Sequence, residues 1–263
     1  MLFELAAVGG RAGRLWQKAA GELDHAFDWA SLDPTGWHPE LVERGRLGWT
    51  ENAFNEHCTA AAMGQLLEVM VQANVPVDLV GMASTFVLDE VVHVELCARV
   101  AMRLGGGAPI RYDAEDLHHD FEPGLSPLQR ANELVVRLCC VGETFSLPML
   151  AGSQRAATHP LTRAVLERIV ADEANHGDLG WLYLDWIGEQ LDAAERRRLF
   201  LAAQDTAAHL VSRYRDPAPP VSSDALPPHF HDMGWMSPTD YRRRADEAVE
   251  AVFTRLQRVG IAG

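Results

Sequence analysis

Two short stretches of the sequence repeat one pattern of acidic residues and histidine. The pattern Asp-Glu-x-x-His-x-(Glu or Asp)-Leu has its glutamates at Glu90 and Glu173 and its histidines at His93 and His176. A glutamate and a histidine three residues apart lie on one face of a helix, so each pair could bind a metal ion. Carboxylate oxygen and imidazole nitrogen together favour iron or manganese, which accept mixed oxygen and nitrogen ligands.

A two-metal site in a helical bundle needs one further carboxylate from each of two other helices. Before the first motif, Glu56 continues an apolar stripe at steps of three, four and seven residues, whereas Glu51 and Glu68 do not. Before the second motif, Glu143 shares its face with apolar residues, whereas Glu133 lies in the first turns near the bundle end. Glu56 and Glu143 are 87 residues apart, close to the 83 that separate the two motif glutamates.

The predicted ligand set has a two-fold pattern and enough charge to neutralise two divalent cations. Its members are Glu56, Glu90, His93, Glu143, Glu173 and His176. Without a partner, each ionisable group on an apolar helix face would cost several kcal/mol to bury. A single Glu-x-x-His would be interpreted most simply as a surface pair. Two copies in register, each with an upstream glutamate at a similar distance, favour a metal site.

The elements that must position these residues are helices, because apolar residues recur at steps of three and four and alternating β-branched runs are few. Four core helices are predicted, at residues 48–74, 78–103, 126–154 and 160–188. The first and second helices, and the third and fourth, are joined by short links. About 20 residues join the two pairs, enough to run back along a bundle. We therefore predict an all-α, ferritin-like four-helix bundle with a long crossover between its second and third helices.

One domain is predicted for the whole chain, residues 1–263. Its parts are a core bundle at about 45–188, an N-terminal segment at 1–44 and a C-terminal helical extension at 189–263. Within the extension we expect a helix at 192–215, a Pro-rich linker at 217–228 and a helix at 237–259. Inside the third core helix, Pro148 is expected either to kink the helix or to unwind it beside the metal and open a pocket.

With these motifs, the chain resembles the ferritin-like di-iron carboxylate superfamily over roughly residues 45–188. The resemblance implies one iron held by Glu56 and His93, the other by Glu143 and His176, and bridging ligands at Glu90 and Glu173. It also implies that Asp89 and Asp172 hydrogen-bond the ligand histidines and fix their tautomer. Many oxygenases of the superfamily have a threonine one turn after the helix-three glutamate, where this chain has Leu147.

The function implied by the resemblance is that of an O2-activating non-haem di-iron oxidase or monooxygenase. It would hydroxylate, desaturate or N-oxygenate a small organic or carrier-bound substrate, with two Fe ions as cofactor and a Mn/Fe pair possible. The alternatives are a ferroxidase or iron-handling protein and a non-catalytic bundle that binds metal structurally. No flavin, NAD or ferredoxin-binding motif is evident, so an electron-donor protein is an expected partner. A homodimer is possible.

Composition narrows the classes of partner. The chain has 23 Lys and Arg against 37 Asp and Glu, a net charge of −14, which disfavours nucleic acid and anionic membranes. The longest apolar stretch is interrupted by charged residues, and no convincing signal peptide opens the chain, so a cytoplasmic location is expected. Cys58, Cys97, Cys139 and Cys140 all fall in helical patterns and are expected to be buried thiols.

Several other residues are expected to be structural. His57 points about 100° away from Glu56 and is expected in a surface or outer layer. His118 and His119 are expected in a solvated loop, and His229 and His231 in a packed tail segment. Tyr183 follows His176 by seven residues and is expected to be a core residue, with an electron relay as the alternative.

Overall fold

The computed structural model describes residues 1–215 and 226–263, and their regular structure is helical apart from an isolated bridge between Leu2 and Arg111. The all-α prediction is confirmed. The long helices are α3 (Pro39–Gln72), α4 (Val77–Arg103), α7 (Pro160–Ile187), α8 (Ala193–Arg215) and α9 (Pro238–Arg258). Between α4 and α7, one continuous helical run comprises α5 (Pro127–Leu134), the π-helical segment η3 (Val135–Glu143) and α6 (Thr144–Ala156). Most of the predicted Pro-rich linker lies outside the described residues.

Short elements complete the chain. Two helices precede the bundle, α1 (Gly10–Ala19) and α2 (Leu23–Ala26). Single 3-10 turns are η1 (Trp29–Ser31), η2 (Ala114–Leu117), η4 (Gly188–Gln190) and η5 (His231–Met233).

Local sequence explains where several helices begin. Ser126 and Gln129 form a capping box at the start of α5, and the hydroxyl of Ser237 accepts a hydrogen bond from the Asp240 amide at the start of α9. In both cases proline follows the cap at the first helical position, where its missing N–H costs nothing.

The prediction for the first core helix was wrong at its N-terminal end, because α3 begins at Pro39 rather than near residue 48. Gly45 and Gly48 lie under the segment that follows residue 226. A Cβ atom at Gly45 would lie 2.5 Å from the Met233 sulfur, and one at Gly48 would lie 3.2 Å from the Trp235 ring. Close tertiary packing therefore outweighs the weak helix propensity of glycine here.

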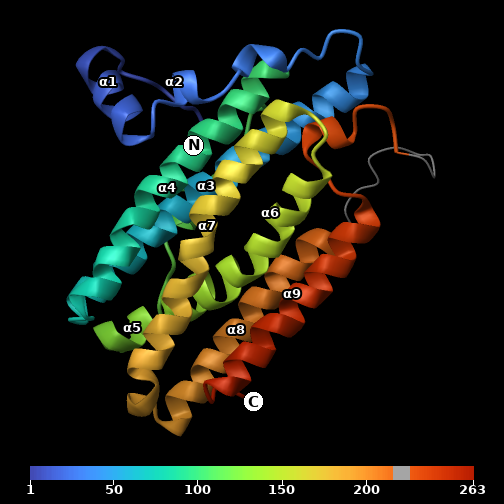
Figure 1. Cartoon of the computed structure of the whole chain (residues 1–263). Coiled ribbons are helices and arrows are strands. Elements are labelled where there is room, and N and C mark those ends of the chain that lie inside the picture. The colour runs from blue at the N-terminus through green and yellow to red at the C-terminus, as the bar shows by residue number, and fades with distance from the viewer. Residues whose placement is uncertain (216–225) are drawn as a thin grey trace.

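The bundle consists of two helical pairs with a helical layer along one side (Figure 1). α3 packs along α4, and α7 packs along η3 and α6, while α4 and α7 join the two pairs. α8 packs on η3 and α9 packs on α6. α3 also packs on α5, but it makes little contact with α6, so packing is least complete along the edge between α3 and α6, called here the open edge.

The predicted ligand residues lie where two apolar cores meet. The first core contains Met63, Phe86 and Leu179, and the second contains Ala53, Val92 and Ile169. On each of α3, α4 and α7, the acidic motif residues fall in sequence between these two sets. The polar centre is therefore a layer between two apolar layers.

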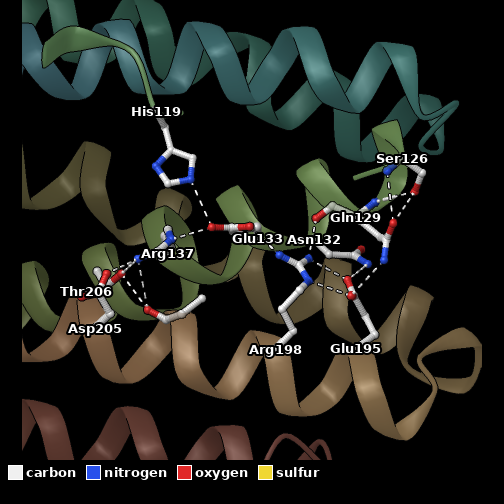
Figure 2. A network of polar contacts seen from close by, with 11 residues as sticks. His119, Ser126, Gln129, Asn132, Glu133, Arg137, Glu195, Arg198, Asp205 and Thr206 are labelled. Atoms are coloured by element: carbon white, nitrogen blue, oxygen red, sulfur yellow. Dashed lines mark hydrogen bonds and ion pairs between the residues drawn. The ribbon is translucent and has the colours of Figure 1, made fainter. Parts of the chain in front are cut away.

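A polar network attaches α8 and the crossover to the helical run that contains η3 (Figure 2). The carboxylate of Glu133 accepts from Arg137 Nε at 3.0 Å, pairs with Arg198 of α8 and lies 3.1 Å from His119 Nε2 of the crossover. Gln65 of α3 bonds both the N–H and the C=O of His119 at 2.9 Å. The expectation of a solvated loop is therefore wrong for His119, whereas His118 is exposed.

One stretch among the described residues has the length and composition of a membrane span. It is the run Pro127–Ala156, whose most apolar window has a mean hydropathy of 1.5 and is 50% buried inside the structure. The run is also the core helix that carries Glu143, which explains its apolar character.

Candidate metal centre

The structure brings all six predicted ligand residues together in the layer between the two cores. They form two groups within which the candidate ligand atoms lie within 4.8 Å of one another. The first group is Glu56, Glu90, His93 and Glu173, and the second is Glu90, Glu143, Glu173 and His176. Glu90 and Glu173 belong to both groups, as bridging positions require.

Each helical run of the bundle supplies part of the centre. Glu56 comes from α3, Glu90 and His93 from α4, and Glu143 from the last position of η3. α7 supplies Glu173 and His176. Five of the six are buried, both histidines completely, while Glu56 is partly exposed.

The histidines are held in a crossed arrangement. His93 Nε2 of α4 lies 3.3 Å from the Asp172 carboxylate of α7, and His176 Nε2 of α7 lies 3.4 Å from the Asp89 carboxylate of α4. Each aspartate therefore holds the histidine of the other motif. An N–H at Nε2 that donates outward leaves the Nδ1 lone pair directed at the centre, which is the tautomer a metal ligand needs.

Several buried atoms at the centre lack hydrogen-bond partners among the described residues. They are both carboxylate oxygens of Glu90, Oε2 of Glu173 and Nδ1 of His93 and of His176. Each Nδ1 atom lies 2.9–3.6 Å from the oxygens of Glu90 and Glu173, but without hydrogen-bond geometry. Buried polar atoms without partners are rare in folded proteins, and five of the seven among the described residues converge on this one place. Oxygen and nitrogen donors arranged in this way fit two divalent cations of the iron or manganese type.

The electrostatics of the centre reflect crowded acidic groups. Burial and the neighbouring charge of Glu90 raise the pKa of Glu56, and burial with the charge of Glu173 raises the pKa of Glu143. Burial alone would lower the pKa of His176, but the surrounding carboxylates together raise it to about 12. Like charges this close favour proton uptake unless a cation lies between them.

The π-helical segment η3 ends at Glu143, so the irregular part of this helical run lies on the N-terminal side of the carboxylate. Unwinding around Pro148 was one expectation and is wrong, because α6 is regular through that residue. η3 approaches α7 closely at Gly180, where an added Cβ would lie 2.7 Å from Cys140 Sγ and 2.8 Å from Cys140 N. Only glycine leaves room for this approach.

Gly180 was missed in the sequence reading. A glycine inside a helix costs about 1 kcal/mol relative to alanine. A glycine in the middle of a helical pattern therefore suggests that another segment packs closely there.

The centre lies beside the open edge between α3 and α6. Glu56 is partly exposed, and so is Leu147, which lies one turn after Glu143 and shares its face. Leu150, one turn further along α6, is also only partly buried. Solvent therefore reaches the bundle from the side on which Glu56 and Leu147 lie.

The other residues whose side chains could take part in a reaction are packed among aromatic rings or hydrogen-bonded within the core. His57 lies among the rings of Phe3, Phe54 and Tyr112 in an outer layer. Tyr183 is buried and donates to Asn132 Oδ1 at 2.7 Å, as expected of a core tyrosine.

The tail segment that carries these histidines is packed, as expected, through the buried Phe230 and Met233, although His229 itself is exposed. His229 stacks on Trp37, and His231 Nδ1 lies 2.8 Å from the Trp235 carbonyl.

All four cysteines are free thiols; Cys97, Cys139 and Cys140 are buried and Cys58 is partly buried. Burial raises the pKa of the Cys97 and Cys139 thiols, and the nearby carboxylates of the centre raise it further. These two thiols are therefore protonated neighbours of the centre.

Comparison of the chain with protein-family models, curated proteins and solved structures finds no match. The centre is therefore interpreted from its own geometry.

Proposed function

We propose that this chain is a ferritin-like di-iron carboxylate protein that acts as an O2-dependent oxidase or monooxygenase. One observation carries the proposal: two four-residue groups share Glu90 and Glu173, and buried donor atoms without partners converge where they meet. This pattern corresponds to two metal ions with two common carboxylates. The long crossover at residues 104–126 agrees with the ferritin-like topology.

In the proposed centre, Glu56 and His93 would hold one iron and Glu143 and His176 the other, with Glu90 and Glu173 available to both. When bound, two ferrous ions would supply electrons for the reduction of O2. A Mn/Fe pair would suit the same oxygen and nitrogen donors.

Residues of the chain balance the metal charge, orient the ligand histidines and keep water away from the centre. The four glutamates balance the charge of two divalent cations. Asp89 and Asp172 hold a proton on Nε2 of the ligand histidines and thereby fix the rings. The apolar cores on both sides exclude water, except at the edge between α3 and α6.

The open edge supports a reaction on an organic substrate rather than on iron alone. Leu147 and Leu150 of α6 are apolar side chains that are only partly buried, and they follow Glu143 by one and two turns. An apolar entrance favours the approach of a small organic molecule or a carrier-bound group over a hydrated ferrous ion, which would be drawn along acidic side chains.

The proposal is tested by anaerobic titration with Fe(II), followed by exposure to O2. We expect two irons per chain, and O2 consumption that rises when a panel of small aromatic and aliphatic compounds is supplied with a chemical reductant. Glu173→Gln should lose metal binding, whereas Glu68→Gln is the matched control, because Glu68 is an exposed carboxylate of α3. A chain that stays free of metal after reconstitution would refute the proposal. Multiple turnovers of Fe(II) to Fe(III) without substrate would favour a ferroxidase, and inertness to O2 a structural metal.

Since the chain has no evident motif for a flavin or nicotinamide, we propose an electron-donor protein as the physiological partner. The net charge of −14 continues to argue against nucleic acid and anionic membranes as partners.

A further inference from the structure

The N-terminal segment stands away from the bundle and encloses a hollow against the outer face of α4. In Figure 1, α1 and α2 lie beside one end of α4, on the opposite side of the bundle from α8 and α9. Many of residues 4–25, though not Arg11 or Leu15, and the outward side chains of α4 line a hollow of about 1340 Å³. No residue of α1 is buried, although α1 is a ten-residue helix with a marked apolar side.

Exposed apolar side chains gather around this hollow. Val8 is 94% exposed, Met102 66% and Leu5 52%, while Leu15, which is 59% exposed, lies on a side of α1 that does not line the hollow. Val91, on the facing turn of α4, is also exposed. Isolated exposed apolar residues are ordinary on a protein surface, but four along one hollow, with Leu15 beside them on α1, form a patch of the kind that marks an interaction site.

The segment is fixed in this position by contacts at several points. The Phe3 amide donates to the Ile110 carbonyl at 2.9 Å, and the Trp16 indole donates to Glu95 of α4. Arg99 of α4 pairs with Asp24 at 2.6 Å. The exposed patch is therefore held in a defined position by hydrogen bonds and an ion pair. The segment is not a loose tail that could fold back over its own apolar residues.

The charges of the patch complement one another in two copies. α1 carries Arg11, Arg14 and Lys18 and no acidic residue, within a chain of net charge −14. Glu4 and Glu22 lie on the same hollow. Among the described residues, none of these five side chains forms an ion pair. A surface with unpaired charges of both signs around an apolar centre is self-complementary, which is what a two-fold contact requires.

We propose that this patch is the contact surface of a symmetric homodimer, in which α1 of each copy covers the hollow of the other. The apolar side chains of the two patches pack at the centre, and the cations of one α1 face Glu4 and Glu22 of the other copy. The proposal goes beyond the metal centre and does not depend on it, because no predicted ligand residue lines the hollow.

Sedimentation velocity of the full chain at several concentrations tests the proposal. We expect a dimer, and we expect Val8→Glu and Leu15→Glu each to raise its dissociation constant at least about tenfold, the effect of losing one well-buried apolar side chain. Leu201→Glu, at an exposed leucine of α8 far from the patch, is the control and should remain dimeric. A chain that is monomeric up to about 100 μM, or a dimer that Val8→Glu and Leu15→Glu leave intact, would overturn the proposal.

A charge exchange distinguishes this surface from any other dimer contact. One variant combines Arg11→Glu, Arg14→Glu and Lys18→Glu, and the other combines Glu4→Arg and Glu22→Arg. Each variant alone should be monomeric, because its two patches then repel, and the mixture should form a heterodimer. A mixture that stays monomeric while both variants keep the native helical content would contradict the proposed pairing.

Discussion

Replacing Gly180 with alanine adds one methyl group where α7 touches η3. The new Cβ would lie 2.7 Å from Cys140 Sγ, 2.8 Å from Cys140 N and 2.9 Å from Cys139 Cβ. Carbon and its non-bonded neighbours are normally about 3.5–4.0 Å apart, and two of the three obstructing atoms belong to backbone or to Cβ, which cannot rotate away. The backbone of η3 must therefore move by about 0.7 Å or more.

This displacement reaches the metal centre because Glu143 lies three residues after Cys140 in the same helical run. Metal–ligand distances are set to within about 0.2 Å, so a shift of this size exceeds the tolerance of a coordinated carboxylate. Forced overpacking of this kind destabilises a fold by about 1–3 kcal/mol. We expect metal affinity at the group containing Glu143 and His176 to fall at least about tenfold, with a smaller effect at the group containing Glu56 and His93.

Anaerobic titration with Co(II), followed by its absorption bands, measures the two sites separately. Wild-type protein should bind two ions, and Gly180→Ala should bind one tightly and the second weakly. Gly64→Ala in α3 and Gly81→Ala in α4 are matched controls, because nothing lies within 4 Å of a Cβ at either position. Both controls should bind two ions and gain slightly in stability, since alanine favours a helix by about 1 kcal/mol over glycine.

The reasoning fails if Gly180→Ala binds both ions with wild-type affinity while its free energy of unfolding falls by the expected amount. That result would show that the added methyl displaces α7 or its neighbours without moving Glu143. If the wild type itself binds no metal, the proposed function fails instead.

Three further predictions test other parts of the structure. Asp172→Asn keeps the shape of the side chain but removes the charge beside His93, and should weaken metal binding at the group containing His93 by about 10- to 100-fold in the Co(II) titration. Burial would raise the pKa of Glu133, but His119, Arg137 and Arg198 together lower it from 4.5 to about 2, so its carboxylate stabilises the fold above pH 4.5. That contribution, about 3 kcal/mol, should be lost as the pH falls from about 5 to 2, and urea unfolding of Glu133→Gln should lack this dependence; an equal dependence in both proteins would contradict the assignment. Leu147→Trp narrows the open edge and should reduce substrate-dependent O2 consumption while both metal ions remain bound; unchanged consumption would place the entrance elsewhere.

The ligand residues could be selected from the sequence because a buried carboxylate must lie on the apolar face of its helix. Glu56 and Glu143 satisfy that condition, whereas Glu68 is exposed and Glu133 is paired with arginines. Helical periodicity therefore predicted which six side chains the fold brings together. Their role as ligands remains a prediction.

The geometry around those residues depends on contacts between distant segments, which periodicity does not encode. The π-helical form of η3 accompanies the close approach at Gly180 and the anchoring of Arg137 to Asp205 and Thr206 of α8. Likewise, the crossed pairing of Asp89 with His176 and of Asp172 with His93 depends on the packing of α4 against α7. Each motif alone is equally compatible with an aspartate that supports its own histidine.

The crossed pairing and the shared glutamates make α4 and α7 the rigid part of the centre. These two helices pack against each other and supply both histidines and both common carboxylates. α3 and η3 supply one carboxylate each, and α3 borders the edge where the bundle is open. α3 already packs on α5 of the opposite helical run, and metal ions would add a connection between Glu56 of α3 and Glu143 of η3. Glu56 is therefore the residue through which bound metal would tie α3 to the rest of the centre.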